Sequence, residues 1–123
     1  MNYNKIDALF SLKPNKDFIW RGTDYSGLEW LDSSTKPTES ELDAEVTRLT
    51  NAEPMRLLRL ERNTRLTACD WVSAKATDTG VAVSDAWKTY RQALRDLPAS
   101  ASPKLDSNGN LILTSVTWPT EPS

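Results

Sequence analysis

The sequence predicts an α+β fold, with a small N-terminal β-hairpin region, a helical hairpin core of two to three helices, and a C-terminal β-hairpin or extended strand. Three observations support it: short aromatic runs near the start, amphipathic segments in the middle, and an Asn-Gly dipeptide before a final apolar run. We therefore expect a β-rich region over 1–35, a helical region over 36–98, and a hairpin with an extended end over 99–123.

The N-terminal region contains two short strand-like runs. Residues 6–12 can form one or two helical turns before Pro14 interrupts them. Residues 17–22 and 27–32 then read as a hairpin or as two short strands. In the first of these runs Phe18 and Trp20 fall on one face, and the second run alternates in the same way.

The helical region opens with a clear start signal. Thr38 and Glu41 have the spacing of a capping box, in which each side chain accepts from the other residue's backbone N–H. An apolar seam follows at spacings of four and three, which predicts a helix from about 39 to 52. Pro54 must either begin a new helix or kink a continuous one. The seam consists of Leu42, Val46 and Leu49.

Residues 55–71 continue in a helical pattern with two apolar faces, so this helix needs neighbours on two sides, and one of them could come from a partner. Residues 72–83 contain Gly80 and small polar residues, and we expect a loop there. The two faces consist of Leu57, Leu60, Thr64, Ala68 and Trp71, and of Met55, Leu58, Leu66 and Cys69.

The last predicted elements are a helix and a hairpin. Ser84 is a suitable cap for a helix over 85–97 that Pro98 ends. Asn108 and Gly109 favour a type I′ turn, and residues 110–118 are strand-like. The residues after Trp118 include two prolines and should be extended.

Composition excludes several classes of function. The 123 residues carry a net charge of −2, which gives no electrostatic reason to bind nucleic acid or a membrane surface, and no apolar run is long enough to span a bilayer. The chain has no histidine and one cysteine, Cys69, so Ser-His or Cys-His catalysis and the common zinc sites are excluded. We therefore expect no enzyme activity, no cofactor and no metal. A single cysteine cannot form an internal disulfide, which indicates a reducing compartment. The 38% apolar content is low and indicates help from a partner.

Two charged patterns are better explained without a ligand. The four arginines at positions 56, 59, 62 and 65 spread around half of a helix and alternate with acidic residues, which favours solvated or paired charges over a phosphate site. Residues 106–110 lack the bidentate glutamate of a calcium loop, so a plain turn is favoured there.

Five tryptophans are the main anomaly of the composition, since large aromatic side chains and arginine are enriched at protein interfaces. On the helix over 85–97 the apolar sector is as wide as an ordinary core stripe, so core packing is the first explanation for Trp87, with partner contact as the alternative. Trp118 is equally suited to either role. The candidate partner-binding residues are Trp71, Trp87, Tyr90, Arg91, Arg95 and Trp118.

The stretches "ERNTRLTACDWV", "AWKTYRQALRDLP" and "WPTEP" resemble the phage tail assembly chaperone family, whose members are often described as tail fibre assembly proteins. The resemblance covers about residues 55–122. The sequence departs from the family pattern at Cys69 and in the stretch 73–84. The matching positions are Arg62, Asn63, Leu66, Asp70, Trp71, Trp87, Tyr90, Arg91, Leu94, Arg95, Asp96, Pro98, Trp118 and Pro119.

The resemblance implies a protein that helps phage tail or tail-fibre proteins to fold or assemble by contact, in the host cytoplasm, without enzyme chemistry. One alternative is a permanent virion subunit of the tail, such as an adaptor, a collar or a fibre-attachment protein, in which the seam over 42–49 supports a homo-oligomer. A more distant alternative is a carbohydrate-binding module that uses Trp20, Tyr25 and Trp30 as stacking platforms.

Overall fold

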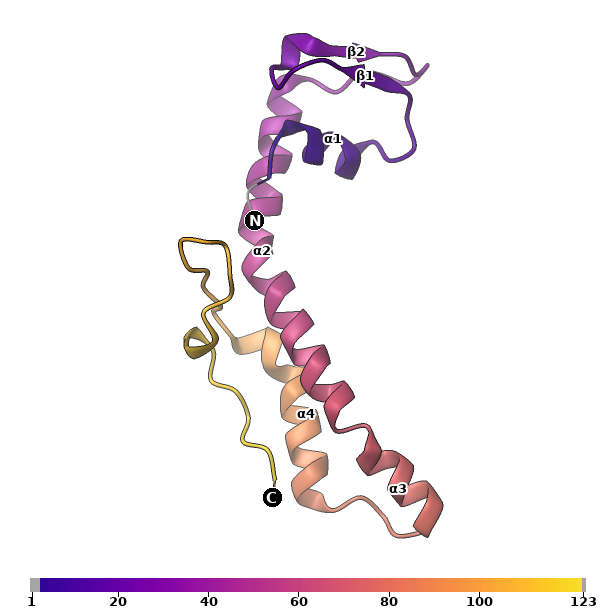
Figure 1. Cartoon of the computed structure of the whole chain (residues 1–123), viewed down its shortest axis with the longest axis vertical. Coiled ribbons are helices and arrows are strands. Elements are labelled where there is room, and N and C mark those ends of the chain that lie inside the picture. The colour runs from indigo at the N-terminus through magenta and orange to yellow at the C-terminus, as the bar shows by residue number, and fades with distance from the viewer. Residues whose placement is uncertain (1–2, 123) are drawn as a thin grey trace. The chain divides into compact units, whose positions relative to one another are not determined.

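A computed structural model describes residues 3–122, and the chain divides into two compact units, Met1–Glu53 and Pro54–Ser123 (Figure 1). The fold is α+β, as predicted, with one two-stranded sheet in the first unit. None of the helices within residues 3–122 is long and apolar enough to cross a membrane. The elements are α1 (Lys5–Leu12), β1 (Phe18–Trp20), β2 (Leu28–Trp30), α2 (Glu39–Ala68), α3 (Trp71–Thr79) and α4 (Asp85–Ser100), with 3-10 turns at Tyr25–Gly27 and Leu113–Ser115.

Helix α1 confirms the turns predicted over 6–12. It begins with a capping box, in which the backbone N–H of Asp7 donates to the Asn4 side chain at 2.9 Å and the backbone N–H of Asn4 donates to the Asp7 carboxylate at 3.0 Å. Ala8 and Leu9 on the inner face of this helix are fully buried. The helix therefore supplies one wall of the first core.

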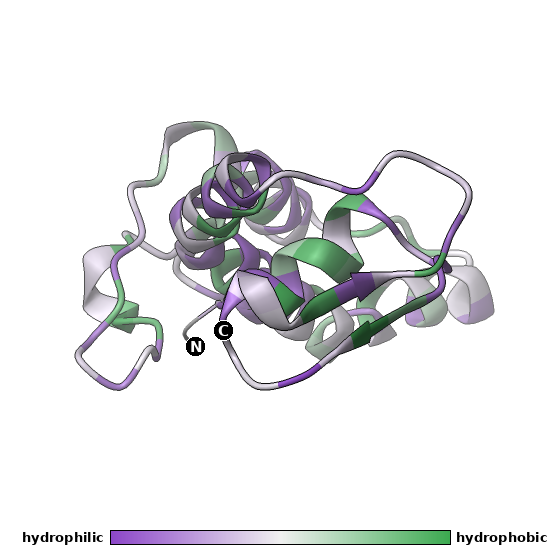
Figure 2. Cartoon of the chain, turned by 90° about the horizontal axis from the view of Figure 1, so that it is seen from above, coloured by the Kyte–Doolittle hydropathy of each residue, from purple (hydrophilic) through white to green (hydrophobic). Residues whose placement is uncertain are grey.

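Strands β1 and β2 form the predicted antiparallel hairpin, with Ile19 opposite Glu29 at its centre. Side chains alternate along a strand, so the neighbouring pairs Phe18–Trp30 and Trp20–Leu28 lie on the face of the hairpin opposite to Ile19 and Glu29. That face packs on α1 and on the start of α2, and Figure 2 shows hydrophobic residues on α1 and on both strands.

Helix α2 begins at the predicted capping box. The Glu41 backbone N–H donates to the Thr38 hydroxyl at 3.1 Å, and the Thr38 backbone N–H donates to the Glu41 carboxylate at 3.4 Å. Of the predicted seam, Leu42 is fully buried and Val46 packs against the same core, so these two residues are used within the first unit. Pro54 lies inside this one helix rather than at the start of another, and it is the first residue of the second unit. Its missing N–H removes one helical hydrogen bond.

Glu45 of α2 is a buried carboxylate in the first unit. It accepts hydrogen bonds from the Arg48 guanidinium, at 2.7 Å to Nη2, and from the Ser11 hydroxyl of α1. The hydrogen bonds from Arg48 and then from Ser11 lower the pKa of Glu45 from 4.5 to about 2. The ionised carboxylate therefore ties α1 to α2.

We expect the first unit to lose stability in acid because Glu45 must take up a proton. A carboxylate whose pKa is lowered in the folded state stabilises the fold at pH values above its normal pKa. For Glu45 this stabilisation disappears as the pH falls from 4.5 toward 2. Glu45→Gln should flatten this loss, measured as the thermal unfolding midpoint over that pH range, whereas Glu39→Gln, at an exposed site, should not. An equally steep loss in Glu45→Gln would contradict the assignment.

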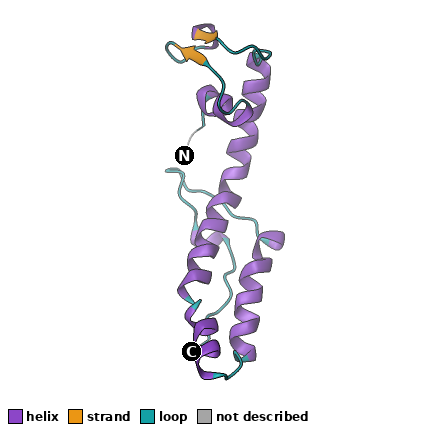
Figure 3. Ribbon diagram, turned by 90° about the vertical axis from the view of Figure 1, so that its right-hand side faces the viewer, coloured by secondary structure: helices purple, strands orange, loops and turns teal. Residues whose placement is uncertain are grey.

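The second unit is built on the second part of α2 and on α4, which lie side by side in Figures 1 and 3. Of the two apolar faces predicted over 55–71, one is buried: Leu58 and Cys69 belong to the core, and Met55 and Leu66 pack against it. The other face points outward, with Leu60 about half exposed. Of the two neighbours that this helix was expected to need, the described chain supplies one, and cover of the other face by a partner stays a prediction.

The loop predicted over 72–83 is wrong in its first part, because α3 occupies Trp71–Thr79. Small polar residues carry little helical preference, but Val72 is buried between this helix and α4 and holds it in place. The helix ends at Gly80, whose φ of 71° is the left-handed conformation common after helices. The loop is thus confined to residues 80–84.

Helix α4 starts at Ser84 as predicted, but Pro98 does not end it. The Ser84 hydroxyl accepts from the Trp87 backbone N–H at 3.4 Å. Pro98 sits in the last turn, where it removes only one helical hydrogen bond, and the Ala101 N–H still bonds to the Leu97 carbonyl at 3.0 Å. The helix therefore continues to Ser100.

The C-terminal hairpin is present in reduced form, as a single β-bridge between Leu105 and Leu111 within a segment drawn mostly as loop in Figure 3. The turn is not type I′, because only Gly109 has a positive φ (81°) and the Gly109 N–H donates to the Asp106 carbonyl at 3.1 Å. The strand expected over 110–118 is interrupted by the 3-10 turn Leu113–Ser115.

Candidate functional site

The second unit has an apolar pocket between α3, the loop 80–84 and the start of α4, which we name the α3–α4 pocket. Its volume is about 220 Å³. No lining residue is acidic, and Lys75 is the one charged group. The pocket can therefore receive an apolar side chain, but it offers no pair of groups for acid–base catalysis. Its apolar lining consists of Trp71, Val72, Ala76, Val81, Ala82, Val83 and Trp87.

Two tryptophan rings from two helices form part of the pocket wall. Trp71 begins α3 and is 53% exposed, while Trp87 lies in the first turn of α4 and is partly buried. The rings meet edge to face, with centroids 5.4 Å apart, and Trp87 makes a similar contact with Tyr90 at 5.8 Å. Trp71 is thus held by a ring contact and still presents half of its surface to solvent.

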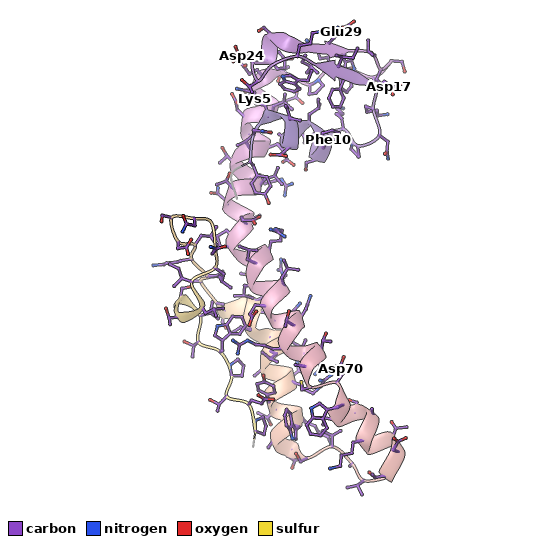
Figure 4. All side chains as sticks on the ribbon, viewed as in Figure 1. Lys5, Phe10, Asp17, Asp24, Glu29 and Asp70 are labelled. Atoms are coloured by element: carbon purple, nitrogen blue, oxygen red, sulfur yellow. The ribbon has the colours of Figure 1, made fainter. Side chains whose placement is uncertain are left out.

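Arg91 of α4 fixes the junction between α2 and α3. Its guanidinium donates to the Leu66 carbonyl at 3.2 Å, to the Cys69 sulfur at 3.0 Å, and to the Asp70 carboxylate at 3.0 Å. Asp70 lies between the end of α2 at Ala68 and the start of α3 (Figure 4). Because Trp71 follows Asp70 in the chain, the Arg91 contacts also set where α3 and its tryptophan begin.

The remaining predicted residues have different surroundings. Tyr90 is 6% exposed and belongs to the core, where burial raises the pKa of its hydroxyl. Arg95 is exposed and donates to the Gln92 side chain at 3.3 Å. Trp118 is partly buried against both core clusters of this unit, with its indole N–H on the Leu113 carbonyl and the Arg65 guanidinium 4.2 Å from its ring centroid.

The structure brings together some predicted residues and adds others. Trp71 and Trp87 share the α3–α4 pocket, and Arg91 and Arg95 line a neighbouring hollow. Sequence reasoning missed Val81, which is 68% exposed and lines the pocket. The sequence carried no clear signal for it, since single apolar residues in a surface loop are common.

Three aromatic residues of the first unit, Trp20, Tyr25 and Trp30, pack inward. Trp20 and Trp30 donate their indole N–H groups to the carbonyls of Asp24 (3.1 Å) and Ser34 (2.7 Å), and the Tyr25 hydroxyl donates to the Pro37 carbonyl. All three rings pack against the core of that unit. Stacking on a sugar needs an open ring face, so this arrangement does not favour the carbohydrate-binding alternative.

The turn over 106–110 uses its carboxylate within the chain. Asp106 accepts from the backbone N–H groups of Asn108 at 2.8 Å and Asn110 at 3.0 Å. Such contacts are those of an Asx-type turn. Within residues 3–122, no three acidic or cysteine side chains gather in an arrangement that could hold a metal ion.

Comparison with known proteins identifies one family. The family model described as phage tail assembly chaperone protein matches residues 55–123, more than half of the chain. The match begins one residue after the start of the second unit, so it covers the α3–α4 pocket together with its supporting core. Comparisons with curated proteins and with solved structures gave no match.

Proposed function

Since the chain belongs to the phage tail assembly chaperone family and its role lies in tail assembly, we propose that it helps a tail or tail-fibre protein to fold or attach by direct contact through the α3–α4 pocket. It acts in the host cytoplasm during assembly and uses no enzyme chemistry. The observation that carries this proposal is an apolar pocket, on the family-matching unit, whose wall residues Trp71 and Val81 are 53% and 68% exposed.

The pocket suits contact with an unassembled polypeptide. A tryptophan ring held by its neighbours loses little conformational freedom on binding, and partly buried aromatic residues contribute most of the binding free energy at many interfaces. A client chain before assembly exposes apolar side chains that later become buried, and a small apolar pocket can cover one of them. In this proposal Trp71 and Val81, which are both more than half exposed, make that contact, and Trp87 supports the Trp71 ring.

We expect Trp71→Ala to weaken binding to the client at least about tenfold, the equivalent of ~1.4 kcal/mol. The test is to co-express the protein with each tail and fibre protein of the same phage, and to measure the soluble yield of the client and its affinity for the purified protein. Leu113→Ala is the matched control, because Leu113 is 48% exposed on the same unit but does not line the pocket. Equal yields and affinities for both variants would contradict the proposal.

A second measurement separates a chaperone from a virion subunit. A chaperone leaves once assembly is complete, so mass spectrometry of purified particles should not detect the protein. Its presence at a fixed ratio to the tail proteins would replace the proposal by the alternative, a permanent tail adaptor, collar or fibre-attachment subunit.

A further inference from the structure

The α3–α4 pocket has a basic neighbour. A second hollow of about 410 Å³ lies beside it on α4, and the two share Val83. This second hollow, which we name the basic hollow, is lined by Ser73, Val83, Lys88, Arg91, Gln92 and Arg95. The α3–α4 pocket and the basic hollow therefore adjoin on one surface.

Carboxylates are missing from the linings of both hollows, although the chain has 17 acidic residues. Asp70 neutralises Arg91 at 3.0 Å. Among residues 3–122, Lys75, Lys88 and Arg95 have no carboxylate within ion-pair distance. Within the described residues, three positive charges that line the two hollows are therefore free of direct ion pairs.

We infer that the segment bound at this surface is an acidic stretch of a tail protein, with one apolar or aromatic side chain as its anchor. This rests on the proposed function and specifies the chemistry of the client. The anchor enters the α3–α4 pocket, and flanking carboxylates approach Lys75 on one side and Lys88 and Arg95 on the other. Complementary charge at the edge of an interface speeds association and excludes partners of the wrong sign.

A second copy of the chain is a less suitable occupant, although its first unit is also acidic. Residues 1–53 contain ten acidic and six basic residues, whereas 54–123 contain seven acidic and nine basic. A contact between the first unit of one copy and the second unit of the next joins two different surfaces. Repeated from copy to copy, such a contact gives open-ended filaments unless it closes into a ring. Binding of a separate client has no such consequence.

The test is selection of random peptides displayed against the full-length protein, followed by affinity measurement on the enriched peptides. We expect enriched peptides to carry net negative charge around an aromatic or aliphatic residue. Lys88→Glu combined with Arg95→Glu should lower the affinity of these peptides by roughly tenfold, as should high ionic strength. Lys104→Glu is the matched control, since Lys104 is exposed on the same unit and lines neither hollow.

The outcomes distinguish this inference from the proposed function. If Trp71→Ala abolishes enrichment but the charge reversals change nothing, the pocket binds its client, and the inference that the client segment is acidic is wrong. If neither change affects the enriched peptides, both proposals fail. If light scattering shows that the wild type self-associates with rising concentration and that the charge reversals prevent it, the occupant is a second copy and the inference is overturned.

Discussion

Replacing Leu94 with alanine is expected to lower the free energy of unfolding of the second unit by about 3 kcal/mol. Leu94 is fully buried on α4, in one core cluster with Cys69, Val72 and Tyr90. Removing its branched side chain leaves a cavity that these neighbours can fill only in part, and the cost adds to the lost burial of apolar surface. The core is the support of the α3–α4 pocket, so the pocket should also loosen.

This prediction is checked by urea unfolding combined with amide hydrogen exchange. Exchange resolves the two units, and we expect Leu94→Ala to lose protection in α4 while α1 keeps its protection. Leu60→Ala, at a site 51% exposed on α2, should change the unfolding free energy by less than about 0.5 kcal/mol. Similar effects of the two truncations would show that the core lies elsewhere.

Replacing Arg91 with alanine should lower the free energy of unfolding of the second unit by about 2 kcal/mol. The substitution removes three hydrogen bonds, to Leu66, Cys69 and Asp70, and also the packing of the long aliphatic part of the side chain. The helix junction that positions Trp71 then has less support. Amide exchange should rise at Cys69, Asp70 and Val72, whose N–H groups close the junction.

Two further substitutions separate charge from geometry at the same place. Arg91→Lys keeps the positive charge but cannot reach three acceptors with one ammonium group, so we expect about half of the loss. Arg95→Ala, one turn further along α4 and exposed, should change stability by less than about 0.5 kcal/mol. If Arg91→Ala is no more costly than Arg95→Ala, the junction does not depend on the guanidinium.

Local signals in the sequence were sufficient at the starts of two helices and in the N-terminal hairpin, although Asn108 and Gly109 predicted a type I′ turn that the structure does not have. Thr38 and Glu41 located the start of α2, Ser84 located the start of α4, and strand-like alternation located the hairpin. These signals act through neighbours in the chain, so no knowledge of distant contacts was needed.

The sequence was insufficient where packing decides. Helix α3 was read as a loop because its stability depends on Val72 packing beside α4, and a single sequence does not show that contact. Pro98 was expected to end α4, because a single sequence does not show that the helix continues for two more residues after this proline. Likewise, periodicity found two apolar faces on α2 but could not tell which one the chain covers.

The candidate site shows the same division. The aromatic and arginine residues of α4 stood out by composition, yet their exposure varies from buried Tyr90 to exposed Arg95. Val81 and Lys88 were not singled out, because they belong to the surface only through the turn that returns the chain from α3 to α4. A surface of this kind is made by the fold and not by one segment.

The buried thiol of Cys69 allows transient opening of the α2–α3 junction to be measured. Cys69 is the chain's single cysteine and is 1% exposed, so an alkylating reagent can reach it only when that region transiently separates. The rate of alkylation therefore measures the frequency of that separation in unmodified protein, and no label has to be introduced near the tryptophan rings.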